Sequence, residues 1–138
     1  MYQRDYILRM IEMIAQLIAG ILKLIKTGDL NRATQDLQSA YRLAFQHDSL
    51  KLKDIIEERL IDTLIREYHY TTGHLEMLAE LFYAEAELLR AERKQAESLL
   101  YYRKSLKLYE YIDKDYRAYS QERLDKMQAI KERLTDSI

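Results

Sequence analysis

Two histidines flank a short turn near the middle of the chain, and they are the residues best suited to binding a metal. His69 and His74 stand on either side of Thr71-Thr72-Gly73, and Glu67 or Glu76 could share a metal with them. Zinc sites that are recognised from sequence place their ligands at characteristic short spacings, and no such spacing occurs here. We therefore interpret both histidines as exposed turn residues, and we predict no metal and no cofactor.

An arginine and a histidine form the other pair that is suited to chemistry. Arg42 and His47 are separated by four residues. This spacing resembles that of the small all-helical ribonucleases of bacterial toxin–antitoxin systems, which implies acid–base catalysis by His47 and phosphate stabilisation by Arg42. Residues five apart on an ideal helix diverge by about 140 degrees, and Leu43 stands where that family usually has a polar residue. A ribonuclease is therefore the alternative hypothesis, and we predict that the chain is not an enzyme.

Composition argues against several other classes of function. The chain of 138 residues has no cysteine, so it has neither disulfides nor thiolate ligands. A net charge of −1 gives no general attraction to nucleic acid or anionic lipid. The longest uncharged run near the start, 13–22, is far shorter than the roughly 20 residues of a membrane helix, and charged residues interrupt any signal-peptide pattern. We expect one cytoplasmic domain over 1–138.

Helix breakers are scarce, which favours an all-α fold. Proline is absent, and there are only three glycines, Gly20, Gly28 and Gly73. Gly28 is expected to end the first helix, and Asp29 is expected to cap the second. The apolar spacing predicts about six antiparallel helices. Their expected ranges are 2–26, 30–46, 50–69, 74–91, 94–111 and 116–134.

Two of the predicted helices repeat one pattern of side-chain size. Each follows a turn and places a small, a large and a small residue at steps of four and three. These residues are Ala33, Leu37 and Ala40 in the second helix, and Ser98, Tyr102 and Ser105 in the fifth. Such steps bring the three residues onto one face, where small side chains let a neighbouring helix approach closely. Because an apolar helix precedes each turn, the repeated unit is a helical hairpin.

The second hairpin resembles a tetratricopeptide repeat. The matching residues are Phe82, Ala86, Leu89, Tyr102 and Leu106. Glu85 departs from the motif, which has leucine there, and the offset of 65 residues between the hairpins is close to two units of 34. The resemblance implies stacked helical hairpins that bind a protein or peptide in a groove.

The whole chain is also similar to an uncharacterised family of short bacterial helical proteins. Members open with an RDYI-like start, here Arg4-Asp5-Tyr6-Ile7, and end with a repeat of the kind seen over 81–108. This second resemblance implies no activity.

The fourth predicted helix carries the candidate groove. The tetratricopeptide resemblance places Glu80, Tyr83, Glu87 and Arg90 on the groove side. Between positions 54 and 87 there are nine acidic residues and two basic ones, so a groove here would favour a basic or tyrosine-stacking partner. A solvated acidic face is the competing interpretation of this charge pattern.

The first predicted helix is apolar over most of its circumference. The same resemblance turns Ala15, Ile18, Leu22 and Ile25 toward the groove side, and an apolar strip of that size is rarely exposed on a monomer. Either the last helix covers the strip within the chain, or a second copy covers it across a two-fold axis. We expect a homodimer.

Tyrosine is unusually frequent, at 12 of 138 residues. Six tyrosines and several basic residues gather between 101 and 119, where such a cluster could stack bases and hold phosphates. Tyr102, Tyr109 and Tyr116 recur every seven residues, however, as in a helix-packing seam. We favour the packing interpretation.

Overall fold

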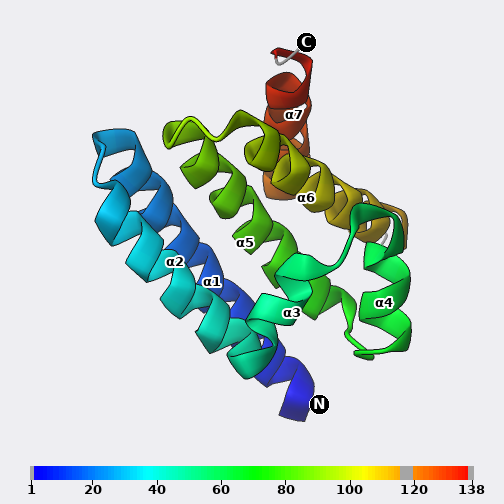
Figure 1. The fold of residues 1–138 in the computed structure, drawn as a ribbon. Helices are drawn as coiled ribbons and strands as arrows, with labels where there is room; N and C mark the ends of the chain where they lie inside the picture. The colour runs from blue at the N-terminus through cyan, green and yellow to red at the C-terminus, as the bar shows by residue number, and fades with distance from the viewer. Residues whose placement is uncertain (1, 116–119, 137–138) are drawn as a thin grey trace.

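Helices make up all the regular structure of the residues that the structure describes. A computed structural model describes residues 2–115 and 120–136, and the side chains of 5–114 and 120–136; this part contains no strand, which confirms the all-α prediction. The α-helices are α1 (Tyr2–Thr27), α2 (Leu30–Phe45), α3 (Ser49–Asp54), α4 (Leu60–Arg66), α5 (Thr72–Ala91), α6 (Gln95–Asp115) and α7 (Gln121–Asp136). Two short 3-10 helices, η1 (Gln46–Asp48) and η2 (Glu57–Arg59), flank α3. Figure 1 shows their arrangement.

The turn between α1 and α2 forms as the sequence predicts. Gly28 has φ of 88°, a left-handed conformation that glycine adopts without steric cost. The Asp29 N–H donates to the Leu24 carbonyl at 2.9 Å, and the Asp29 side chain accepts from the N–H of Arg32 at 3.3 Å. These bonds satisfy backbone groups at the end of one helix and the start of the next, so α1 and α2 form a tight hairpin.

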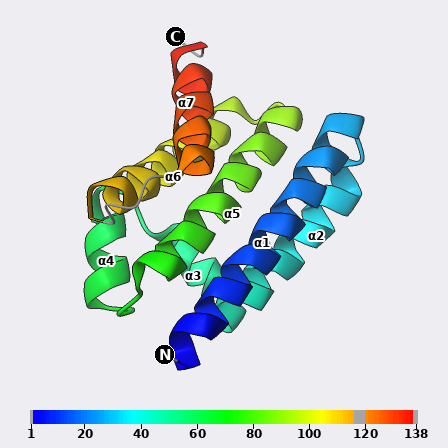
Figure 2. The same ribbon diagram turned by 180° about the vertical axis from the view of Figure 1, so that it is seen from behind.

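Helix α5, rather than α1, is the central helix. It contacts α1, α2 and α6, and Figures 1 and 2 show it between the α1–α2 hairpin and α6. Ser98 and Ser105 of α6 donate to the carbonyls of Ala86 and Ala79 of α5, at 2.8 and 2.7 Å. All six residues of the repeated small–large–small pattern are buried. The small side chains therefore permit close packing, and the two serines add hydrogen bonds between the helices.

The third predicted helix is broken in the structure. Ile55 and Ile56 have extended backbones, with ψ of 126° and 152°, and they separate α3 from η2 and α4. Two lysines of α6 bind carbonyls beside this break, because the Nζ of Lys104 donates to Lys53 O and the Nζ of Lys107 to Glu57 O, both at 3.0 Å. The helix predicted over 50–69, which the sequence allowed to be bent, is instead divided into α3, η2 and α4, and these long-range contacts stabilise the break.

Helix α6 is longer than predicted. It continues through 113–115, where we predicted a break, and Ile112 is buried near its end. Arg123 of α7 is also buried and donates to Asp113 at 3.2 Å. The expected start of the last helix at Tyr116 lies outside the described residues. Over the part that is described, no helix is long and apolar enough to cross a membrane.

His74 takes part in the capping box at the N-terminus of α5. The backbone N–H of Thr71 donates to His74 Nδ1 at 3.2 Å, and the Tyr70 ring stacks on the imidazole with centroids 4.7 Å apart. Burial lowers the pKa of His74 below its ordinary value of 6.5. Only an unprotonated Nδ1 can accept this hydrogen bond, so the cap requires the neutral imidazole.

We expect this cap to make the stability of the protein depend on pH. The folded state binds fewer protons at His74 than the unfolded state, so stability should fall as pH drops below about 6.5 toward the folded pKa. A loss of up to about 1 kcal/mol in urea unfolding between about pH 7.5 and pH 5 would match the value of a cap. His74→Gln keeps a capping side chain without the titration, so its pH dependence over this range should be weaker. Equal pH dependence in both proteins would contradict the assignment.

Candidate functional site

The predicted groove on α5 faces another helix of the same chain. Glu80 pairs with Lys126 of α7, whose Nζ also lies 5.1 Å from the centre of the Tyr83 ring. Two turns further along α5, Glu87 accepts from the Nε of Arg133 at 3.2 Å. Three of the four predicted groove residues therefore contact, or lie beside, basic side chains of α7.

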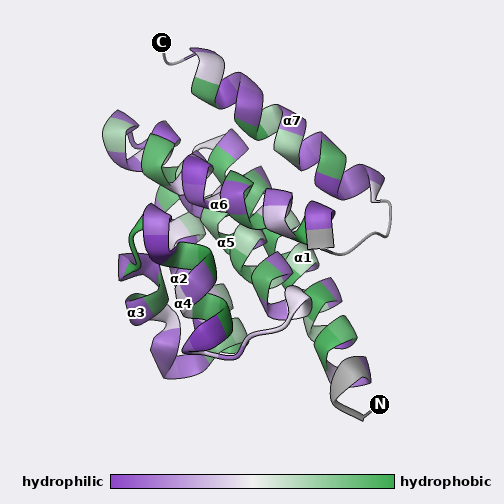
Figure 3. Cartoon of the chain, turned by 90° about the vertical axis from the view of Figure 1, so that its right-hand side faces the viewer, coloured by the Kyte–Doolittle hydropathy of each residue, from purple (hydrophilic) through white to green (hydrophobic). Residues whose placement is uncertain are grey.

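Helix α7 follows α5 in one constant register. Both ion pairs join residues 46 positions apart and in the same order, so α7 runs parallel to α5. Figure 3 shows α7 as an outer layer beside α6. Arg90, the fourth predicted groove residue, is exposed, and its side chain forms no hydrogen bond or ion pair with α7 in the described part of the chain.

The groove also contains two tyrosines whose hydroxyl groups stay protonated. Burial, followed by the proximity of Glu87, raises the pKa of Tyr83 to about 12. Tyr102 donates to Glu87, and burial together with this hydrogen bond raises its pKa far above the ordinary value. Glu87 therefore receives one hydrogen bond from Tyr102 of α6 and two from Arg133 of α7. This carboxylate ties the two helices to α5.

The proposed dimer residues on α1 do not lie on one exposed face. Ala15 is exposed, Leu22 and Ile25 are half-buried, and Ile18 is 1 % exposed because it packs in the core of the chain. The tetratricopeptide phasing turned Ile18 toward a groove, whereas the structure places its side chain in the core of the chain.

A different part of α1 leaves large apolar side chains in solvent. Tyr6, Met13 and Leu17 are 59 %, 45 % and 39 % exposed, at steps of seven and four that bring them to one side of the helix. Figure 2 shows α1 at the front of the molecule, with this stretch on the outside of the bundle. If α1 forms a dimer surface, these three residues are better candidates for it than the four predicted ones.

The tyrosines of α6 are mostly structural. Tyr102 and Tyr109 are buried, and Lys104, a basic member of the same cluster, has its Nζ 5.3 Å from the centre of the Tyr101 ring. Arg103 pairs with Glu57 at 3.1 Å. These contacts agree with a packing seam rather than a face that stacks bases. Tyr116 and Tyr119 lie outside the described residues.

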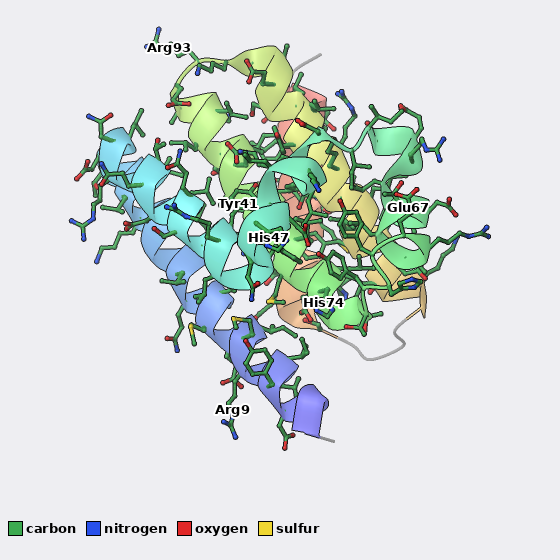
Figure 4. The ribbon with its side chains drawn as sticks, turned by 60° about the horizontal axis from the view of Figure 1, so that its bottom comes forward. Arg9, Tyr41, His47, Glu67, His74 and Arg93 are labelled. Carbon is green, nitrogen blue, oxygen red and sulfur yellow. The ribbon has the colours of Figure 1, made fainter. Side chains whose placement is uncertain are left out.

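A second concave site lies where α2 runs into α3. It is an open cleft of about 610 Å³, within the range of small-molecule pockets. Its lining residues are Gln38, Tyr41, Arg42, Gln46, His47, Ser49, Leu50 and Lys53. Figure 4 shows Tyr41 and His47 close to this junction. The lining contains no acidic residue, although the chain has 23.

A partly buried ion pair joins the cleft lining to α5. The Nζ of Lys53 is 3.0 Å from Oε1 of Glu85 and 5.0 Å from the centre of the Tyr41 ring. The Tyr41 hydroxyl donates to the Leu81 carbonyl at 3.5 Å. Burial, and then the nearby Glu85 carboxylate, raises the pKa of Tyr41 well above its ordinary value. The Lys53 charge is therefore balanced from within the protein.

The cleft brings Arg42 and His47 into one site. The divergence expected on a continuous helix does not apply, because α2 ends at Phe45 and Gln46 has φ of 53°. The His47 side chain is 85 % exposed, and its Nε2 lies 3.7 Å from Oδ1 of Asp48. Arg42 is exposed, and its side chain has no hydrogen bond or ion pair with the described residues. Both residues line the cleft, but no hydrogen bond or ion pair among the described residues joins their side chains in a catalytic geometry.

The two histidines of the central turn do not converge on a metal site. His74 holds the capping box, whereas His69 is exposed with φ of 57°. In Figure 4 the side chains of Glu67 and His74 are seen at separate places around α4 and α5. Over the described residues, no group of three histidine or acidic side chains could hold a metal ion.

Sequence reasoning missed the basic residues of α7 and most of the cleft. Lys126 and Arg133 are seven residues apart, the same spacing as Glu80 and Glu87, so matching charge spacings would have been the signal. Gln38 and Gln46 stand four residues before and after Arg42 in the sequence, although Gln46 lies in η1 rather than α2. The spacing of these polar residues could be read from the sequence, whereas the position of α3 beside them could not.

Comparison with protein-family models, with curated proteins and with solved structures finds no match to this chain. The chain is a small all-helical protein for which no family is identified.

Proposed function

We propose that this protein is a non-enzymatic, cytoplasmic interaction module built from tetratricopeptide-like hairpins, and that it binds a partner on the face of α5 that α7 now covers. The observation that carries the proposal is the parallel register of α7 on Glu80, Tyr83 and Glu87. In tetratricopeptide proteins such a face belongs to the binding groove.

The side chains of α7 indicate what this face recognises. Lys126 and Arg133, seven residues apart, pair with Glu80 and Glu87 at the same separation. Between them, Met127 and Ile130 are buried. The partner chemistry that fits is an amphipathic helix with two basic residues seven apart and an apolar face beside them.

A peptide with the sequence of residues 121–136 is the probe that tests this proposal. Tethered α7 competes with added peptide at a local concentration that reaches the millimolar range, so the unsubstituted protein should bind the peptide weakly. Lys126→Gln/Arg133→Gln in the protein should release its own α7 and raise peptide affinity by about tenfold or more. Adding Glu80→Lys/Glu87→Lys to that variant should abolish the binding. Fluorescence anisotropy of labelled peptide measures each affinity.

Glu58→Lys/Glu110→Lys is the matched control, because it reverses two exposed acidic residues outside the groove. Added to the variant with released α7, it should leave peptide affinity nearly unchanged. If both charge reversals weaken peptide binding equally, the peptide is attracted by the net charge of the protein alone, and the proposed groove is wrong.

We also infer that the protein is a homodimer. The exposed side chains of Tyr6, Met13 and Leu17 support this inference, because large apolar residues gathered on one helix face usually meet another surface. A second copy would cover the strip by symmetry. Binding through α5 and pairing through α1 use different helices, so one need not block the other.

A further inference from the structure

We propose that the cleft between α2 and α3 binds a small organic acid with one carboxylate on an apolar body. This site is formed by α2, η1 and α3, whereas the α5 groove is covered by α7, so the inference does not depend on the proposed function. Its volume of about 610 Å³ suits a ligand of ordinary metabolite size.

The charges around the cleft select a singly charged ligand. The Nζ of Lys53 already lies 3.0 Å from Oε1 of Glu85, and the Nε2 of His47 lies 3.7 Å from Oδ1 of Asp48. Arg42 is left as the cation that no carboxylate among the described residues balances. A guanidinium offers two parallel N–H donors to one carboxylate. A polyanion such as RNA would bring several charges to a site with one uncompensated cation.

The remaining lining supplies an apolar surface and neutral hydrogen-bonding groups. Leu50 is 74 % exposed at the cleft, so a ligand that covers it removes apolar surface from water. The buried Tyr41 forms part of the inner wall. Gln38 of α2 and Gln46 of η1 stand four residues before and after Arg42 in the sequence, and they carry no charge. The cleft therefore combines one anion-binding group with an apolar wall.

Octanoate is a suitable probe, because it has one carboxylate and an apolar chain. Isothermal titration calorimetry on the full chain should detect octanoate binding, with acetate and octan-1-ol each binding at least about tenfold more weakly. Arg42→Gln should lower octanoate affinity by about tenfold or more, since it removes a charge-assisted hydrogen bond. Leu50→Asp should also weaken it.

Arg32→Gln is the matched control on the same helix, because Arg32 lies outside the cleft lining and faces Asp36 at 3.6 Å. It should bind octanoate like the unsubstituted protein. Circular dichroism should show that all the variants keep their helical content, since Arg32, Arg42 and Leu50 are exposed.

Four results would overturn the proposal. They are no detectable octanoate binding, equal binding of octan-1-ol, equal losses in Arg42→Gln and Arg32→Gln, and tighter binding of a single-stranded RNA oligonucleotide than of octanoate. Cleavage of that RNA, lost in His47→Ala, would favour the ribonuclease hypothesis instead.

Discussion

Replacing Ile18 with glutamate should unfold the protein. Ile18 is 1 % exposed, so the substitution removes a buried apolar side chain and places a carboxylate where water cannot reach it. Losing the isoleucine costs about 2–5 kcal/mol, and burying an unpaired polar group adds several more. A small domain has only about 5–15 kcal/mol of stability, so the sum is comparable to the whole. Far-UV circular dichroism and urea unfolding would measure the loss.

Leu17→Glu is the matched variant at the neighbouring position. Leu17 is 39 % exposed, so a glutamate there reaches water, and the chain should stay folded. Sedimentation equilibrium should then give a dimer for the unsubstituted protein and a monomer for Leu17→Glu. A folded, monomeric Ile18→Glu variant would contradict the core assignment and would put Ile18 at a subunit interface instead. A monomeric unsubstituted protein would remove the dimer proposal.

Breaking the ion pair between Lys53 and Glu85 should cost more stability than removing it entirely. Their side chains are 27 % and 12 % exposed, and Glu85 comes from the central helix. Lys53→Met leaves the Glu85 carboxylate without its cation, and we expect a loss of about 2–4 kcal/mol. Glu85→Leu leaves the more exposed Lys53, which can extend toward solvent, so its cost should be smaller, about 1–2 kcal/mol.

The double variant Lys53→Met/Glu85→Leu tests whether the stability lost in the single variants comes from an unpaired charge or from lost packing. It should recover to within about 1 kcal/mol of the unsubstituted protein, because a well-packed apolar pair can replace a buried ion pair. Urea unfolding of all four proteins completes the thermodynamic cycle. Additive losses in the double variant would show that the two side chains act independently, contrary to the 3.0 Å contact.

Local patterns in the sequence predict most of the helices. Gly28 and Asp29 formed the predicted turn, because both act through their own backbone and nearest neighbours. The small residues at Ser98 and Ser105 likewise marked the face on which α6 meets α5. The first helix is apolar over most of its circumference, and this pattern did not distinguish the buried Ile18 from the exposed Leu17 beside it.

Features that depend on distant residues could not be predicted in the same way. The break at Ile55 has neither glycine nor proline, and the lysines that bind its neighbouring carbonyls come from about 50 positions later in the chain. The groove residues Glu80 and Glu87 were placed on one face of their helix, but the sequence did not show that α7 covers it. The cleft likewise forms only when α3 folds back beside Arg42.

The lysine contacts at this break have a consequence for the order of folding. The Lys53 carbonyl receives its hydrogen bond from Lys104 of α6, whereas the Glu57 carbonyl accepts one from Lys107 and one from the backbone N–H of Leu60 at the end of η2. Until α6 is in place, the Lys53 carbonyl lacks its Lys104 donor, and the break between α3 and α4 lacks both lysine contacts. The shape of the middle of the chain therefore depends on the docking of α6.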